Sequence, residues 1–155
     1  MAFERGRRLG VDVGLARVGV ASCDPDGILA TPVETIAVSD GPEAEPAPWA
    51  AEITRLLELA EEYEALAVVV GIPASLRGGH TASTKMAASF VSVLRERIPD
   101  SIAVFTADER LSTVQASSNL RAAGKKAKKQ RSVIDQAAAV AILQTWLDSA
   151  RAARW

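Results

Sequence analysis

Residues 9–22 read Leu9-Gly-Val-Asp-Val-Gly-Leu-Ala-Arg-Val-Gly-Val-Ala-Ser22, and this stretch decides the fold. Apolar residues run through 9–13 and 18–22 with a short turn between them, which predicts a β-hairpin. A third strand is expected over 28–38, bent at Pro32 because proline cannot donate a hydrogen bond to a strand ladder. The chain therefore starts with an antiparallel meander of three strands.

From Trp49 onward the apolar residues take a helical spacing, and helices then alternate with strands. This order is typical of an α/β domain with a mixed sheet. The expected elements are helices from Trp49 and over 82–97, strands over 66–70 and 102–106, and two helices that begin at Ser112 and Ser132. The basic run 125–131 is expected to be the loop between the last two helices.

Length and composition predict one folded domain, residues 1–155. Apolar residues make up 48% of the chain and charged residues 24%, which excludes a wholly disordered protein. The single cysteine, Cys23, excludes an internal disulfide, and no apolar run approaches the ~20 residues of a membrane span. The first eight residues lack the apolar stretch of a signal peptide, so a soluble cytoplasmic protein with no membrane partner is expected.

The formal net charge of −1 conceals an uneven distribution of charge. Residues 1–76 carry 5 basic and 13 acidic residues, whereas residues 77–155 carry 13 basic and 6 acidic residues. Acidic residues gather between 40 and 64, and six of the eleven residues from 121 to 131 are basic. Such asymmetry indicates an anion-binding surface, with nucleic acid as the commonest partner. A solvated helix face and a solvated loop are the alternative interpretation.

Several carboxylates stand at positions that suggest metal chemistry. Asp12 lies inside the first predicted strand, where a carboxylate is costly unless it is paired or binds a cation. Asp108 and Glu109 follow the last strand, at the edge where open α/β sheets place their sites, and Asp135 lies in the first turn of the last helix. Converging carboxylates hold Mg²⁺ or Mn²⁺, and two such ions activate water for phosphodiester hydrolysis. Local roles remain open: Asp108 as a cap or a partner of Arg110, and Asp135 as an acid favoured by the helix dipole.

Four stretches together resemble the YqgF/RuvX family of Holliday-junction resolvases and pre-16S rRNA 5′-end nucleases. They are Gly10-Val-Asp-Val-Gly-Leu-Ala-Arg-Val-Gly-Val-Ala21, Val69-Val-Gly-Ile-Pro73 with the following Gly78-Gly79, Ala107-Asp-Glu-Arg-Leu-Ser-Thr113, and Ser132-Val-Ile-Asp-Gln-Ala-Ala-Ala139 running on to Ile142-Leu143. The first stretch alone is weakly specific, but the four in this order span nearly the whole chain.

The resemblance implies an α/β, RNase H-like fold: a five-stranded mixed sheet, its first three strands an antiparallel meander, flanked by helices. It also implies a metal-dependent nuclease in which Asp12, Glu109 and Asp135 are catalytic and hold two Mg²⁺ or Mn²⁺ ions. Glu109 is preferred over Asp108 as the ligand, with Asp108 close enough to share the role. Arg17 matches the family's arginine in the hairpin, which would either contact phosphate or order Asp12, and Arg110 is a candidate for the same two roles.

The expected partner is nucleic acid, either pre-rRNA or branched DNA, and cutting a junction symmetrically would require a homodimer. The basic run lacks interleaved aromatic residues, so it is expected to bind phosphates rather than to stack on bases. The positions expected to bind nucleic acid are Arg17, Arg77, Lys85, Arg110, Arg121, Lys125, Lys126, Lys128, Lys129 and Arg131.

Two other functions compete with this hypothesis. A catalytically silent RNA-binding factor in ribosome assembly would use the same basic surface. Gly10-x-Asp12-x-Gly14 in a hairpin also resembles the phosphate loop of actin-like ATPases, which enclose the nucleotide between two such domains where this chain has one.

Overall fold

The structure is a computed structural model that describes residues 4–73, 82–108 and 127–152, and the side chains of these except for 127–135. None of the helices in these ranges is both long enough and apolar enough to cross a membrane.

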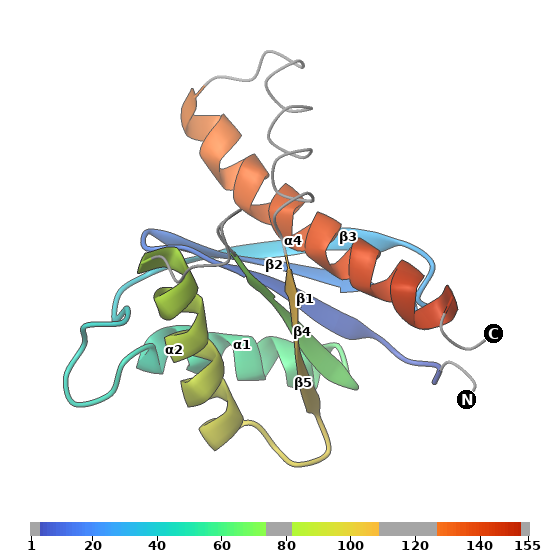
Figure 1. Ribbon diagram of the computed structural model, residues 1–155, viewed down its shortest axis with the longest axis horizontal. Coiled ribbons are helices and arrows are strands. Elements are labelled where there is room, and N and C mark those ends of the chain that lie inside the picture. Colours follow the sequence, from blue (N-terminus) through green and yellow to red (C-terminus); the bar gives the residue numbers. More distant parts are fainter. Residues whose placement is uncertain (1–3, 74–81, 109–126, 153–155) are drawn as a thin grey trace.

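Five strands form one mixed sheet in the order β3-β2-β1-β4-β5 (Figure 1). Strands β1, β2 and β3 pair antiparallel, whereas β4 pairs parallel with β1 and β5 pairs parallel with β4. The strands are β1 (Arg8–Val13), β2 (Arg17–Cys23), β3 (Ala30–Ala37), β4 (Ala67–Ile72) and β5 (Ala103–Asp108). The predicted five-stranded mixed sheet that starts with an antiparallel meander is confirmed.

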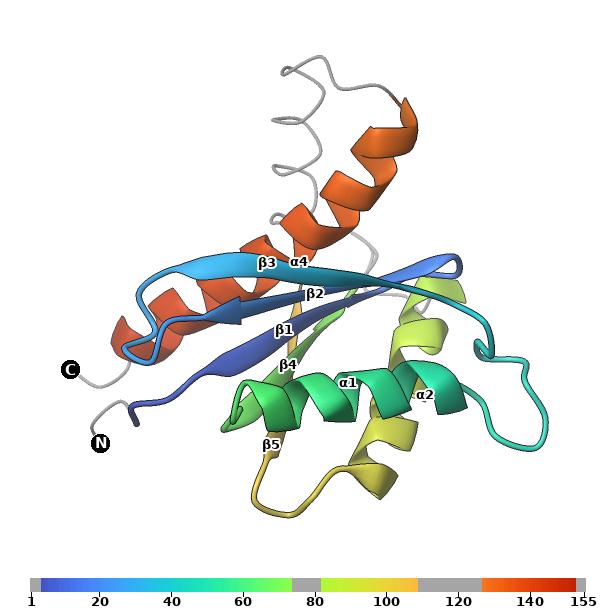
Figure 2. The same cartoon turned by 180° about the vertical axis from the view of Figure 1, so that it is seen from behind.

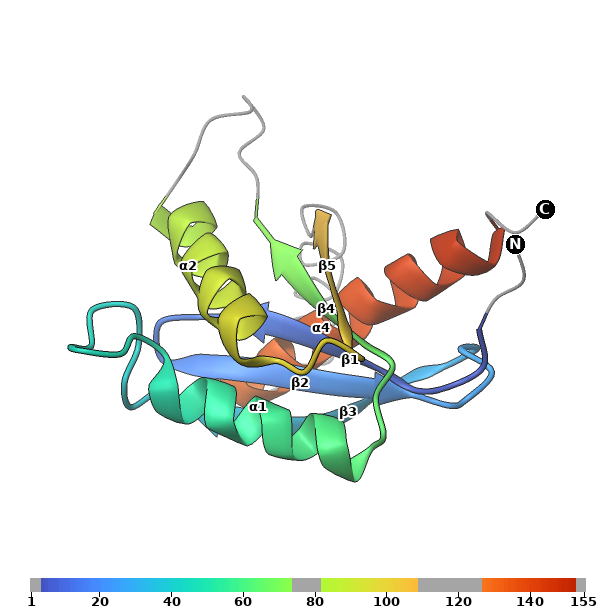
Figure 3. The ribbon, with the colours of Figure 1, turned by 90° about the horizontal axis from the view of Figure 1, so that it is seen from below.

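Helices cover the two faces of the sheet unequally. Helices α1 (Ala50–Glu62) and α2 (Ala82–Arg97) lie on one face, and α4 (Ala127–Ala152) crosses the other (Figure 2). The view from below shows the sheet between these two layers (Figure 3). The acidic helix α1 therefore lies on the face of the sheet opposite to α4.

Strand β1 contributes residues to both faces of the sheet, because successive side chains of a strand point to opposite sides. Leu9, Val11 and Val13 are buried in the core formed with α1 and α2. Gly10 lies on the other side and receives α4: a Cβ at this position would stand 2.6 Å from the Leu143 Cβ and 2.8 Å from the Ala139 carbonyl oxygen. Glycine therefore allows the helix to approach the strand closely.

A buried carboxylate fixes the loop that enters α1. Glu52 is fully buried, and its oxygens accept hydrogen bonds from the N–H groups of Ser39, Asp40 and Gly41 at 2.8, 3.2 and 3.2 Å. Burial alone would disfavour the charged form, but these donors outweigh it and hold the pKa of Glu52 below its ordinary value. The charge of Glu52 is therefore part of the fold.

The structure changes several predicted boundaries. Helix α4 begins at Ala127 rather than Ser132, because the lysine- and alanine-rich run after Gly124 contains good helix formers and no breaker. Asp108 is the last residue of β5 rather than the residue after the strand. In β3 the register shifts opposite Val20 and Ala21, next to Pro32, as the predicted bend requires. The helix expected from Ser112 lies outside the described residues.

We predict that Glu52→Gln lowers the free energy of unfolding by about 2 kcal/mol at neutral pH, because a charge-assisted acceptor is lost from a buried site. The folded-state pKa is lowered, so this stabilisation is present above the unfolded value of about 4.3 and is lost as pH falls through the folded value. Urea unfolding over a pH series should show wild type and variant converging in acid.

Glu61→Gln is the matched control, since Glu61 is exposed on the same helix, and this variant should match wild type at neutral pH. A constant difference between Glu52→Gln and wild type from pH 7 down to pH 2 would contradict the assignment.

Candidate active site

Asp12 lies on the α4 face of the sheet, in a row of small neighbours. Its side chain is half-buried. Asp12 pairs with Gly19 of β2, and Gly19 pairs with Thr35 of β3, so these three residues form one row across the sheet, the row of Asp12. On the other side of β1, Val11 pairs with Val70 of β4. The next residues along the two strands are Asp12 and Gly71, so Gly71 is the β4 neighbour of Asp12, and Gly71 in turn pairs with Ala107 of β5. The strand neighbours of Asp12 on both sides are therefore small residues.

Helix α4 crosses this row. Gly10 precedes Asp12 by two residues on the same face and contacts Ala139 and Leu143. Toward the start of the helix, Gln136 Nε2 donates a 2.8 Å hydrogen bond to Thr35 Oγ1. Helix α4 therefore contacts the row of Asp12 through Gln136, the residue that directly follows Asp135.

Asp108 lies on the opposite face of the sheet from Asp12. Its partner in β4 is Ile72, which packs with the core under α1 and α2. Strand alternation gives Ala107, not Asp108, the face of Asp12. Asp12 and Asp108 thus lie near the same end of the sheet, in β1 and β5, but on opposite faces.

The other predicted site residues are placed only in part. Arg17 begins β2 and is half-buried, with Ala37 as its neighbour in β3. Four predicted positions belong to α4 by their backbone alone: Lys128, Lys129, Arg131 and Asp135. The positions that lie outside the described residues are Arg77, Glu109, Arg110, Arg121, Lys125 and Lys126.

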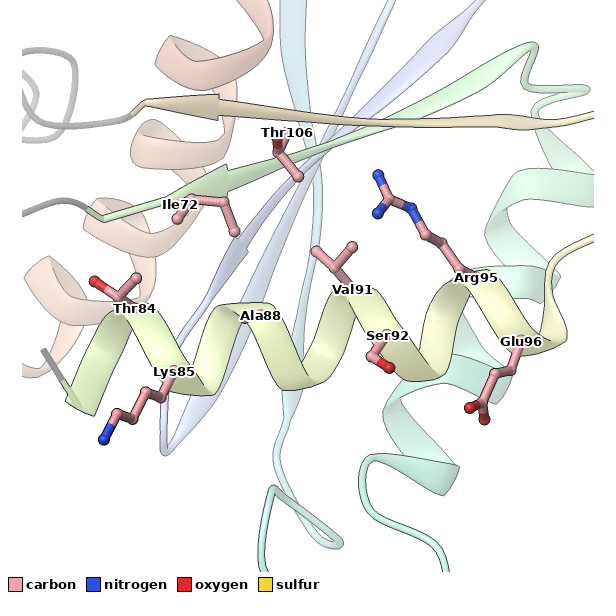
Figure 4. Close-up of a pocket in the computed structure, with 9 residues that line it drawn as sticks. All are labelled: Ile72, Thr84, Lys85, Ala88, Val91, Ser92, Arg95, Glu96 and Thr106. Carbon is pink, nitrogen blue, oxygen red and sulfur yellow. The ribbon is translucent and has the colours of Figure 1, made fainter. Parts of the chain in front are cut away.

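Lys85 borders the grooves beside α2, on the side of the sheet away from Asp12. One groove of about 670 Å³ runs between α2 and the ends of β4 and β5, with Ile72, Thr84 and Thr106 on its walls (Figure 4). Lys85 points away from the strands, whereas Arg95 extends toward β5 (Figure 4). This groove faces the α2 layer, so it is separate from the space around Asp12.

A divalent cation requires several oxygen ligands that meet at one point. Over 4–73, 82–108 and 136–152, no three His, Cys, Asp or Glu side chains gather at one point. Asp12 is the carboxylate in these ranges that lies in the sheet on the α4 face with small neighbours, and a hard cation prefers such an oxygen ligand. Asp12 fits the role of one ligand to such an ion, and a complete site would need further ligands from positions beyond these ranges.

Sequence reasoning missed Thr35 and Gln136. Nothing local marks either residue, because their contact joins positions 101 residues apart. Gln136 does belong to a quoted stretch, directly after Asp135, and that adjacency was the available signal.

The family model described as RuvX, Holliday junction resolvase, matches residues 6–149. The chain belongs to the RuvX family. A relative from Nocardia farcinica, named "Putative pre-16S rRNA nuclease", is 53% identical over 147 residues, which cover 93% of this chain and 78% of the relative. A relative of the same name from Streptomyces avermitilis is 54% identical over 151 residues, covering 97% and 91%. The resemblance of the four stretches to this family is confirmed.

Solved resolvases share the fold of this RuvX-family chain. Thermus thermophilus RuvC in complex with a Holliday junction substrate superposes with a TM-score of 0.54 at 17% identity, covering 96% of both chains. The yeast mitochondrial Holliday junction resolvase Ydc2 gives a TM-score of 0.55 at 12% identity, covering 95% of this chain and 80% of that one. The predicted RNase H-like fold is confirmed by these neighbours.

We predict that Asp12→Asn weakens Mn²⁺ binding by at least about tenfold, because it removes a charged oxygen ligand, while Asp108→Asn on the opposite face weakens it much less. Electron paramagnetic resonance of free Mn²⁺ titrated with each protein measures both affinities. Equal losses in the two variants would contradict the separation of the faces.

Proposed function

We propose that this chain is a hydrolase, a nuclease that cleaves phosphodiester bonds in structured nucleic acid with the help of Mg²⁺ or Mn²⁺. Membership of the RuvX family supports the class of reaction. The single structural observation that carries the proposal is the carboxylate of Asp12 in the middle of a sheet, with glycine neighbours and a helix above it. A half-buried carboxylate placed in this way offers a hard oxygen ligand, which a metal ion beside a phosphate would use.

We assign the metal site to Asp12, Glu109 and Asp135. The register of β5 gives Asp108 the α2 face, which leaves Glu109, the next residue, as the candidate from that strand end. Asp135 precedes Ala139 by four residues, one helical turn, and Ala139 lies over Gly10. Asp12 lies two residues beyond Gly10 along β1, toward the part of α4 that contains Asp135. When bound, divalent ions would lower the pKa of a water nucleophile and offset the charge of the leaving oxygen.

The other side chains of the proposed site bind and orient the substrate. Arg17 and the basic positions at the start of α4 would neutralise phosphates and set the register of the backbone without reading its sequence. Helix α1, on the far side of the sheet, presents the exposed carboxylates of Glu58, Glu61 and Glu62 (Figure 2). Nucleic acid would therefore approach the α4 face and be repelled from the α1 face.

We propose precursor 16S rRNA as the substrate, because relatives more than 50% identical over most of this chain carry that name. The description of the family favours Holliday junctions as the second candidate. The two differ in assembly, since cutting a junction at two symmetric points needs a two-fold dimer and trimming one RNA end does not. A silent RNA-binding factor differs from both in binding without cleavage.

We predict that the purified chain cleaves a precursor rRNA end in Mg²⁺ or Mn²⁺. The Asp12→Asn variant should bind the same RNA but lose at least about 100-fold in kcat, because it removes a ligand of the metal ion that would stabilise the charge of the transition state. A cleavage time course beside a binding titration measures the two effects, with a four-way DNA junction as the parallel substrate.

Asp26→Asn, in the exposed loop between β2 and β3, is the matched control and should cleave like wild type. Binding without cleavage of either substrate by wild type, across both metals, would refute the nuclease proposal and support the silent factor. Cleavage that survives in Asp12→Asn would refute the assignment of Asp12.

A further inference from the structure

We infer that Gln136 is a positioning residue for this site: its hydrogen bond to Thr35 sets the rotation of α4 and thereby the place of Asp135 relative to Asp12. The inference rests on the proposed function, because it concerns the same carboxylates. Gln136 itself contacts neither substrate nor metal in this account.

The first observation is the row in which Thr35 stands. Thr35 pairs with Gly19, and Gly19 pairs with Asp12, so the three residues lie side by side on the α4 face. A hydrogen bond from α4 to Thr35 is therefore a bond from the helix to the row of Asp12. Its length is 2.8 Å, and both side chains are partly buried.

The second observation is the character of α4 next to this bond. Gln136 is followed by Ala137, Ala138 and Ala139, and the close approach at Gly10 falls at Ala139. Methyl groups pack tightly but present low ridges, so they resist rotation of a helix about its axis weakly. The large buried side chains Ile142, Leu143 and Leu147 begin only one turn later. The hydrogen bond of Gln136 therefore restrains the rotation of α4, which the alanines restrain only weakly.

The size of the effect follows from helix geometry. A rotation of about 20° moves a Cα by about 0.8 Å, because Cα atoms lie about 2.3 Å from the helix axis. A misplacement of about 1 Å at reacting groups costs up to about 100-fold in rate. The neighbour of Gln136 in the chain is Asp135, so rotation at this point is transmitted to that residue without an intermediate.

A second glutamine provides a matched control. Gln144 also ties α4 to the β3 side of the sheet: its Oε1 accepts from the Ala30 N–H at 2.9 Å, and its Nε2 donates to the Ile28 carbonyl at 2.8 Å. Ala30 is five residues from Thr35 along β3, a span of about 16 Å. Gln144→Leu therefore removes comparable helix-to-sheet hydrogen bonds at the end remote from Asp12.

The experiment compares Gln136→Leu, Thr35→Val, the double variant, Thr35→Ser and Gln144→Leu in the full chain. Each protein is measured for kcat and KM on the substrate that wild type cleaves, for Mn²⁺ affinity without nucleic acid by electron paramagnetic resonance, and for thermal unfolding. We expect Gln136→Leu and Thr35→Val each to lower kcat and Mn²⁺ affinity by about 10- to 100-fold with KM unchanged. The double variant should be no worse than either single, because both remove one interaction.

Thr35→Ser keeps the hydroxyl and should restore kcat, while Gln144→Leu should lose stability and keep kcat. Equal losses of kcat in Gln136→Leu and Gln144→Leu would overturn the inference, and so would failure of both Gln136→Leu and Thr35→Val to fold, since either result makes the bond merely structural. If wild type binds Mn²⁺ but cleaves nothing, the proposed nuclease activity fails, and the Mn²⁺ affinities alone decide the role of Gln136. Wild type that neither binds Mn²⁺ nor cleaves refutes both proposals.

Discussion

Helix α4 lies against strand β1 at Gly10, and the placement of the proposed site depends on this contact. A Cβ on residue 10 would come within 2.6 Å of Leu143 Cβ and 2.8 Å of a backbone oxygen, so any other residue would push the helix away from the sheet. Because Asp12 is two residues further along the same face, the distance between α4 and the carboxylate is set by the same contact. One face of the strand thus packs in the apolar core, and the other carries Asp12 of the proposed site.

The two faces also separate the charges of the chain. Helix α1, which carries four glutamates and one arginine, packs with α2 on the core face, and the basic positions 128, 129 and 131 belong to the helix on the Asp12 face. The net charge of −1 is therefore the sum of an acidic first half and a basic second half of the chain. Under the proposed function, polyanions would be drawn to the α4 side of the sheet and repelled from the α1 side.

Much of the fold could be predicted from local patterns. The alternation of 9–13 and 18–22 gives the hairpin, and the helix over 82–97 has the predicted bounds. The face of Asp108 could not be predicted, because it depends on β5 running two residues beyond Thr106 and on its register with β4. The bond between Gln136 and Thr35 was also beyond local reasoning, since only the folded chain brings residues 101 positions apart into contact. Asp12 stands as a predicted site residue because a carboxylate inside a strand conflicts with its surroundings, and that conflict is visible in the sequence itself.

The most direct measurement of the central claim is a crystal structure of the chain soaked with Mn²⁺, with the metal located by its anomalous scattering. The account predicts an anomalous peak beside the Asp12 carboxylate, between the sheet and α4, with Glu109 and Asp135 among the ligands and no peak at Asp108 on the α2 side. A peak on the α2 side, or an Asp12 carboxylate paired with a protein cation and free of metal at saturating Mn²⁺, would contradict it.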